Sequence, residues 1–222
     1  MYLYSIFQSI SGEAGLFPQG SWCTFVRLQG CNLRCTWCDT KSAQETSREA
    51  RPEAAQVEEI VDQCFTKRVL ITGGEPLLQP ETTQLIQALL LNKHEVQIET
   101  NGSLFIPSQF SDVGWVVDYK CPSSGMKQWM PPLTTFVRQF QGQKHVTVKF
   151  VLNDEQDLQA AFTAMHKMLN YGFPGMFALS PTDGSKALTA RVMTAIEAAK
   201  HFPSLQDRIV FSLQLHKILG VN

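Results

Sequence analysis

The sequence predicts an α/β fold, an incomplete (partial) TIM-like barrel of parallel strands with outer helices. Segments rich in β-branched and aromatic residues alternate with segments whose apolar residues recur at helical spacing, which is typical of βα units around a parallel sheet. We expect about six or seven strands but only four clear helices, too few for a closed eight-stranded barrel. Polar and glycine-rich residues follow several strands, and active sites in such barrels lie at that edge.

The N-terminal part of the chain carries a polar stretch, a strand and a helix. Residues 2–20 are too polar for a core, so we expect a lid or binding loop there. Residues 22–28 are rich in aromatic and β-branched residues and predict a strand. Apolar residues at helical spacing over 57–65 predict a helix with Cys64 on its buried face. A thiol in such a stripe is more often packing than a metal ligand.

The rest of the chain alternates between short apolar runs and amphipathic stretches. Residues 68–72 predict a strand that ends at a Gly-Gly-Glu-Pro turn (73–76), and an amphipathic helix with its apolar side over 85–90 follows. The stretch 122–143 has little periodicity, so we expect a loop with a short helix. Further strands are predicted at residues 95–99, 115–119, 146–151, 176–179 and 209–213, and further helices at 154–169 and 188–199.

Length and composition limit the class of protein. A chain of 222 residues suits one domain, 1–222, with a sizeable buried core. A formal net charge of −1 gives no basic face for nucleic acid, so a small-molecule substrate is the default. No apolar run approaches the roughly 20 residues of a membrane span, and the N-terminus lacks a signal peptide. We therefore expect a cytoplasmic protein, in which six cysteines favour metal or catalytic use over disulfides.

Three cysteines lie close together directly after the strand predicted at 22–28. Cys31, Cys35 and Cys38 have a Cys-x3-Cys-x2-Cys spacing, and thiolates prefer iron–sulfur clusters, zinc or cuprous copper. A [4Fe–4S] cluster normally takes four cysteines, so three would leave one iron open to a small molecule. A structural zinc site, which needs a fourth protein ligand, is the alternative that this spacing leaves open.

The cysteine loop resembles the signature of the radical S-adenosylmethionine (SAM) superfamily, and the glycine turn at 73–76 resembles that superfamily's second signature. The finer resemblance is to the 7-carboxy-7-deazaguanine synthase family and runs along nearly the whole chain. The matching motifs are Phe7-Gln8-Ser9 with Gly12-Glu13, residues 25–31, Trp37-Cys38-Asp39-Thr40, Thr72-Gly73-Gly74-Glu75-Pro76, residues 98–102 and Gln214-Leu215-His216-Lys217.

The resemblance implies a radical SAM carbon–nitrogen lyase. Such an enzyme converts 6-carboxy-5,6,7,8-tetrahydropterin to 7-carboxy-7-deazaguanine with loss of ammonia, in the biosynthesis of queuosine, a tRNA modification, and of other 7-deazapurines. The implied cofactors are a [4Fe–4S] cluster, SAM and Mg2+. The implied partners are an electron donor such as flavodoxin or ferredoxin and a second copy of the chain in a homodimer.

The resemblance also implies roles for particular residues, carried over position by position. Cluster ligands fall on Cys31, Cys35 and Cys38, and the Mg2+ ligand falls on Thr40. SAM contacts fall on Gly74, Asp118, Tyr119, Lys120, Ser180, Pro181, Thr182 and Asp183. Substrate contacts fall on Ile10, Ser11, Gly12, Arg27, Thr72 and Asn222. Arg27 also makes physical sense, because a guanidinium fork suits a carboxylate.

Two other functions share part of this pattern. A glycyl-radical activating enzyme would keep the cysteine spacing but act on a protein partner, and it should lack the motifs at both ends of the chain. A non-catalytic iron–sulfur or zinc-binding module would keep the thiols but need neither the glycine turn nor Arg27.

Overall fold

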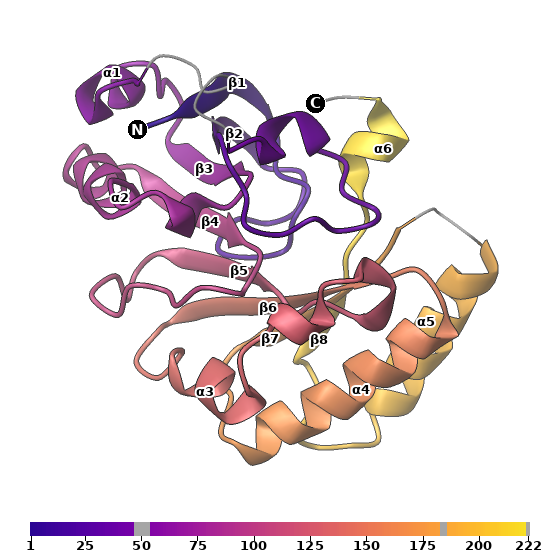
Figure 1. Cartoon of the computed structure of the whole chain (residues 1–222). Coiled ribbons are helices and arrows are strands. Elements are labelled where there is room, and N and C mark those ends of the chain that lie inside the picture. The colour runs from indigo at the N-terminus through magenta and orange to yellow at the C-terminus, as the bar shows by residue number, and fades with distance from the viewer. Residues whose placement is uncertain (47–53, 183–185, 221–222) are drawn as a thin grey trace.

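The computed structural model describes residues 1–46, 54–182 and 186–220, without the side chains of residues 216 and 217. An eight-stranded sheet forms its centre, with the strands side by side in chain order (Figure 1). β1 runs antiparallel to β2, and the strands from β2 to β8 are parallel. The strands are β1 (Leu3–Ile10), β2 (Trp22–Leu28), β3 (Arg68–Gly73), β4 (Glu95–Thr100), β5 (Gly114–Asp118), β6 (His145–Leu152), β7 (Met176–Pro181) and β8 (Ile209–Phe211).

Helices connect most of the parallel strands and follow the outer side of the sheet (Figure 1). Among the described residues β8 pairs only with β7, so the barrel stays open and the predicted incomplete α/β barrel is confirmed. No helix in the described part of the chain has the length and apolar character needed to cross a membrane. The helices are α1 (Val57–Val61), α2 (Thr82–Leu91), α3 (Leu133–Arg138), α4 (Glu155–Asn170), α5 (Lys186–Ala199) and α6 (Leu215–Leu219), with 3-10 turns at Lys41–Gln44, Pro76–Leu78, Pro122–Ser124 and Lys127–Trp129.

The prediction of a lid or binding loop over residues 2–20 is wrong for its first half. Residues 3–10 form β1, an edge strand whose side chains are mostly half-buried because only one neighbour covers it. Its pairing with β2 is reinforced where the ring of Phe7 stacks on that of Phe25, with centroids 5.0 Å apart. Polar residues on an edge strand hide the period-two pattern that identifies a buried one.

The helix predicted over 57–65 is shorter than its apolar pattern suggests. α1 ends at Val61, and Cys64 lies in the turn that follows, where it is nevertheless buried. The Cys64 thiol donates a hydrogen bond to the carbonyl oxygen of Ile60. Cys64 therefore packs in the core as predicted, but from a turn instead of a helix.

The two faces of the sheet have different roles. The main hydrophobic core lies between the sheet and the outer helices, and Ile71, Val117 and Met165 are fully buried in it. A smaller cluster on the inner face contains Phe17, Phe25 and Leu70. Phe17 comes from the loop after β1 and has no exposed surface, which contributes about 2 kcal/mol of hydrophobic stabilisation. This loop fills one end of the open barrel and leaves the other end for a site.

Candidate active site

A cavity of about 310 Å³ opens on the inner face, at the carboxyl ends of the parallel strands. Its wall combines the cysteine loop after β2, the glycine turn after β3, and polar side chains from β4, β5 and β6. Parallel strands all end at the same edge, so residues far apart in sequence converge here. The size suits a small-molecule ligand.

The cysteine loop spans residues 29–40 and brings thiols to this cavity. Cys31 and Cys35 line the cavity directly, and Cys38 is tied back by a hydrogen bond from its backbone N–H to the Cys35 carbonyl oxygen, at 3.2 Å. Burial raises the pKa of the Cys35 thiol, and the nearby thiols of Cys38 and Cys31 raise it further. Burial likewise raises the pKa of Cys31. Within the described residues no three His, Cys, Asp or Glu side chains converge closely enough to hold a single ion.

The glycine turn after β3 holds the cysteine loop in place through its backbone. Gly74 N donates to Leu28 O at 2.9 Å, and Glu75 N donates to Gly30 O at 2.7 Å. A Cβ on Gly74 would lie only 2.0 Å from the Gly30 carbonyl oxygen, so no larger residue fits without moving the loop. Gly74 also lines the cavity. Because Gly74 has no side chain, its backbone packs directly against that of Gly30 and also borders the cavity.

The segment after β5 supports the other side of the cysteine loop. Trp37 Nε1 donates to Ser123 Oγ at 3.2 Å, and Thr36 N donates to Ser124 O at 3.1 Å. Ser123 is held in turn by Asp157, a fully buried carboxylate in the first turn of α4. This support is not predictable from the sequence, because nothing in the spacing of Ser123 and Asp157 indicates that they meet.

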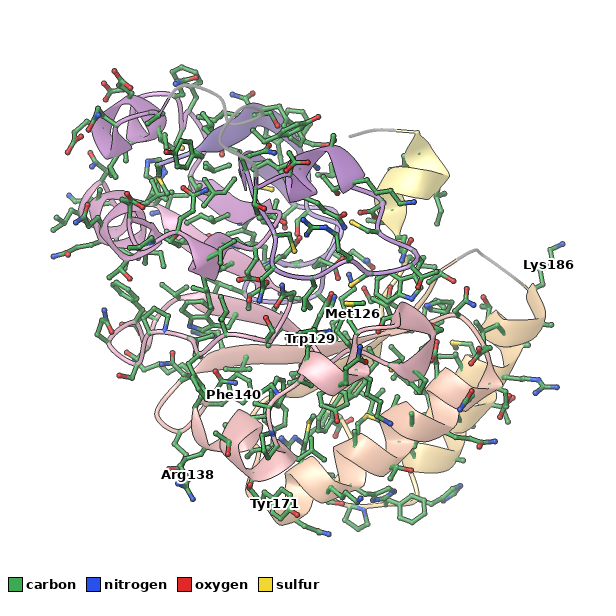
Figure 2. The ribbon with its side chains drawn as sticks, in the orientation of Figure 1. Met126, Trp129, Arg138, Phe140, Tyr171 and Lys186 are labelled. Carbon is green, nitrogen blue, oxygen red and sulfur yellow. The ribbon has the colours of Figure 1, made fainter. Side chains whose placement is uncertain are left out.

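The 3-10 turns of the same segment extend along the cysteine loop. Met126 and Trp129 lie close together there (Figure 2), and Arg34 N donates to Met126 Sδ at 3.4 Å. Lys120 is buried beside the loop, with its Nζ 5.2 Å from the centre of the Trp37 ring and in an ion pair with Asp118. Burial alone would lower the pKa of Lys120, but Asp118 and Cys35 outweigh it and hold the pKa above its ordinary value.

A band of charged side chains crosses the inner face beneath the cysteine loop. Lys149 of β6 forms an ion pair with Glu13 of the loop after β1, and both side chains are almost buried. Burial would lower the pKa of Lys149, but the carboxylates of Glu13, Asp118 and Glu99 outweigh it and raise the pKa. Glu13, Glu99 and Lys149 all line the cavity, yet none was predicted as a site residue. Glu13 and Glu99 belong to motifs quoted above, whereas Lys149 shows only as a charge inside an apolar strand.

Glu99 is the member of this band whose pKa is shifted toward neutral pH. Its carboxylate accepts a hydrogen bond from Thr72 Oγ1 at 3.0 Å, and its remaining exposed surface faces the cavity. Burial raises the pKa of Glu99 to about 8, and the nearby Glu13 carboxylate adds to the shift, while Lys149 opposes it. Burial therefore favours the protonated form of Glu99 in the folded protein over a wider pH range than in an exposed carboxyl.

The raised pKa of Glu99 predicts a pH-dependent stability. A carboxyl whose pKa is higher in the folded state contributes stability that is complete below its ordinary value of 4.5 and is lost as the pH rises toward 8. The urea midpoint of the wild-type chain should therefore fall more between pH 5.5 and pH 8 than that of Glu99→Gln, whose amide cannot ionise. Parallel midpoints for the two proteins across this range would show that Glu99 does not titrate there.

The structure brings most of the predicted site residues to one cavity. Ser11 is fully buried and its hydroxyl donates to Glu13 O, and Tyr119 packs in the core against Phe136 and Phe150, so neither side chain lines the wall. Ser180, Pro181 and the partly exposed Cys38 do not line the cavity, and Asp183 and Asn222 fall outside the described residues. The predicted residues that line the cavity are Ile10, Gly12, Arg27, Cys31, Cys35, Thr40, Thr72, Gly74, Asp118, Lys120 and Thr182.

The donor groups at the cavity fit the cofactors that the resemblance implies. Thiols on one loop are the ligands that an iron–sulfur cluster takes. Two buried polar atoms on this side of the sheet, Ser180 Oγ and Gln214 Oε1, have no hydrogen-bond partner among the described residues. Gln214 lines the cavity, and Ser180 pairs in register with Val151, which also lines it. Buried polar atoms without partners are costly, so both sites suit a polar ligand.

Comparisons with known proteins place the chain in a class and then in a family. The model of the radical SAM superfamily matches residues 25–118, the part that carries the cysteine loop and the glycine turn. The 7-carboxy-7-deazaguanine synthase of Methanospirillum hungatei is 31% identical over 100% of this chain and 86% of its own length. That of Koribacter versatilis is 33% identical over 77% of this chain and 74% of its own. The chain belongs to the 7-carboxy-7-deazaguanine synthase family of radical SAM enzymes.

Solved structures agree on the fold. The crystal structure of QueE from Escherichia coli superposes with a TM-score of 0.70 at 21% identity, covering 96% of this chain and 93% of that one. Streptococcus suis SuiB bound to S-adenosylmethionine gives a TM-score of 0.57 at 14% identity, over 83% of this chain and 45% of SuiB. The family assignment does not favour the two alternatives, a glycyl-radical activating enzyme and a non-catalytic metal-binding module.

Proposed function

We propose that this chain converts 6-carboxy-5,6,7,8-tetrahydropterin to 7-carboxy-7-deazaguanine with loss of ammonia. The observation that carries the proposal is a single cavity lined by the cysteine loop, the glycine turn and the cavity-facing Arg27. The named activity of the relatives supports it. When bound, the cluster and SAM would supply a radical that removes a hydrogen atom from the substrate, which is chemistry that no side chain provides.

The residues of the chain bind and orient these groups. Cys31, Cys35 and Cys38 would hold the cluster, and Gly74 and Asp118, which line the same cavity, would contact SAM. The buried charges beneath are already paired, Lys149 with Glu13 and Lys120 with Asp118. From the family resemblance we also propose Mg2+, a flavodoxin or ferredoxin as electron donor, a homodimer and a cytoplasmic location.

A binding comparison tests the substrate class. The carboxylated tetrahydropterin and the same pterin without its carboxylate are titrated, under anaerobic conditions, into the cluster-loaded protein with SAM present. The carboxylated compound should bind at least tenfold more tightly, because the partly buried guanidinium of Arg27 at the cavity suits its carboxylate. Equal affinities for the two pterins would argue against a carboxylated substrate.

Arg27 is the residue that we expect to pair with this carboxylate. Its guanidinium lines the cavity and lies over the Phe7 ring, 5.0 Å from the ring centre, which holds the planar fork in place. Losing a bidentate, partly buried partner costs on the order of 2–5 kcal/mol, so Arg27→Ala should weaken substrate binding roughly 30-fold or more. Arg27→Lys should restore binding only in part, since an ammonium lacks the fork.

Arg68 offers a matched control for Arg27. It also lies over a phenylalanine ring, that of Phe17, and it pairs with Glu95, but it does not line the cavity. Substrate affinity should be unchanged in Arg68→Lys. Wild-type affinity in both Arg27 variants would rule out the assigned contact and reopen the choice of substrate.

Thr40 provides the proposed Mg2+ ligand. Its hydroxyl lines the cavity and donates to Asp39 Oδ1 at 2.9 Å, so a hydroxyl and a carboxylate oxygen meet where a hard cation would bind. Thr40→Ala should raise the Mg2+ concentration needed for half-maximal turnover about tenfold. Iron and sulfide content should not change, because the hydroxyl is no cluster ligand. An unaltered Mg2+ response in this variant would remove Thr40 from the site.

A further inference from the structure

The residues that follow three neighbouring strands form a hydrogen-bonded network around Cys31. None of the roles proposed above requires this network. Glu75 follows β3, Asn101 follows β4, and Cys31 follows β2. All three residues are buried: Glu75 has no exposed surface, and Asn101 and Cys31 each keep 8%. Hydrogen bonds between groups this well shielded from water are stronger than at the surface.

Glu75 fixes the backbone of the residues after β4. Its carboxylate accepts a hydrogen bond from Thr100 Oγ1 at 2.7 Å and another from Asn101 N at 2.6 Å. The same carboxylate accepts from Leu77 N at 2.9 Å, which anchors it to its own turn. The position of Asn101 is therefore set by a side chain from the neighbouring strand end.

Ser103 fixes which way the Asn101 amide points. Asn101 Oδ1 accepts from Ser103 N at 2.9 Å and from Ser103 Oγ at 2.6 Å. With its oxygen held by two donors, the amide must turn its nitrogen to the opposite side. There Nδ2 donates to Asn32 Oδ1 at 2.9 Å and to Cys31 Sγ at 3.7 Å.

The Cys31 sulfur thus receives two N–H groups, one from Asn101 Nδ2 and one from the backbone of Leu33 at 3.4 Å. Hydrogen bonds to a cluster's sulfur ligands stabilise the additional negative charge of the reduced state and so raise the reduction potential. The backbone donor is present whatever the side chain at position 33. The Asn101 amide, by contrast, is a side-chain donor that a substitution can remove.

We propose that Asn101 is a positioning residue that donates a hydrogen bond to the Cys31 sulfur and thereby raises the reduction potential of the cluster held by the three cysteines. The proposal rests on the assignment of Cys31 as a cluster ligand. It gives the Asn-bearing motif after β4 a role in setting how readily the enzyme accepts its electron, separate from any contact with SAM or substrate.

The test compares the cluster potential of wild type, Asn101→Ala and Asn101→Asp. Each protein is reconstituted anaerobically, its iron and sulfide are counted, and its reduction is followed by electron paramagnetic resonance at a series of fixed potentials without SAM. In Asn101→Ala the ratio of reduced to oxidised cluster at the wild-type midpoint should fall about tenfold, equivalent to about 59 mV for a one-electron couple. Asn101→Asp keeps the size but places an acceptor against the sulfur, and its shift should be at least as large.

Thr100→Val is the matched control. It removes a hydrogen bond to the same Glu75 carboxylate from the neighbouring buried residue and leaves the donor to sulfur in place, so its potential should equal that of wild type. Equal potentials in all four proteins, or equal shifts in Asn101→Ala and Thr100→Val, would overturn the proposal. Loss of the cluster from both Asn101 variants would overturn it too, by making Asn101 a requirement for assembly. Absence of a cluster from the wild type would instead contradict the cysteine assignment.

Discussion

Replacing Cys31, Cys35 or Cys38 by alanine is expected to abolish both cluster binding and the reductive cleavage of SAM. The three thiols are the proposed protein ligands, and a cluster that keeps one iron open for SAM cannot lose another ligand and stay bound. Each single variant should fold, because the cysteine loop is also held by backbone hydrogen bonds from Gly74 and Glu75. The measurement is iron and sulfide content after anaerobic reconstitution, followed by 5′-deoxyadenosine formation with SAM and dithionite.

Cys64→Ala is the control for this series. Cys64 is a buried thiol of the outer core, and its loss should cost only packing, roughly 1 kcal/mol of unfolding free energy, with cluster content and SAM cleavage unchanged. A full cluster in any of the three loop variants would refute the ligand assignment. Zinc without iron or sulfide in anaerobically purified wild-type protein would restore the structural zinc alternative.

Lys149→Met is expected to destabilise the fold strongly. The Lys149 ammonium is almost buried, pairs with the Glu13 carboxylate, and lies near Asp118 and Glu99. Removing one partner of a buried ion pair typically costs about 3–5 kcal/mol, because the other charge is left without compensation. The same pair links the loop after β1 to β6, so the loop that fills the barrel should also loosen. Urea unfolding at pH 7 measures the change.

Two variants separate pair burial from a general effect of removing a lysine. Lys144 lies directly before β6 and forms an exposed ion pair with Asp112. Lys144→Met breaks this pair, and its urea midpoint should match that of wild type. Adding Glu13→Gln to Lys149→Met should recover part of the lost stability, since no uncompensated carboxylate then remains at position 13. A Lys149→Met midpoint equal to that of wild type would mean that water reaches the pair.

The sequence predicted the architecture from its alternating periodicity, because the parallel strands β2 to β7 are largely buried and stand out as apolar runs. β1 was not predicted, because an edge strand does not need a continuous apolar run. The length of α1 was overestimated because Cys64 is buried from the turn after Val61, while Phe65 continues the apolar pattern although its side chain is exposed. In both cases the neighbouring elements in the fold, and not the local sequence pattern, determined the secondary structure.

The site was predictable where its residues lie in short motifs and hidden where it depends on register. The thiols and the glycine turn act through fixed spacing along the chain, and the spacing identified them. Lys149, Asp157 and Ser123 act across distances of tens of residues, and only the parallel register of the strands brings them to the cavity or to the cysteine loop. Tyr119 was predicted as a site residue from its place in the chain, but the alternation of side chains along β5 turns its ring into the core between the sheet and the outer helices.

The measurement that tests the proposed activity most directly is turnover of the carboxylated tetrahydropterin by the reconstituted chain. Protein carrying its cluster is incubated anaerobically with SAM, Mg2+, a reductant and 6-carboxy-5,6,7,8-tetrahydropterin, and the products are identified by mass and by an ammonia assay. We expect 7-carboxy-7-deazaguanine and ammonia in equal amounts, with none formed by Cys35→Ala. SAM cleavage to 5′-deoxyadenosine with the pterin recovered unchanged would contradict the proposed function while leaving the radical SAM class intact.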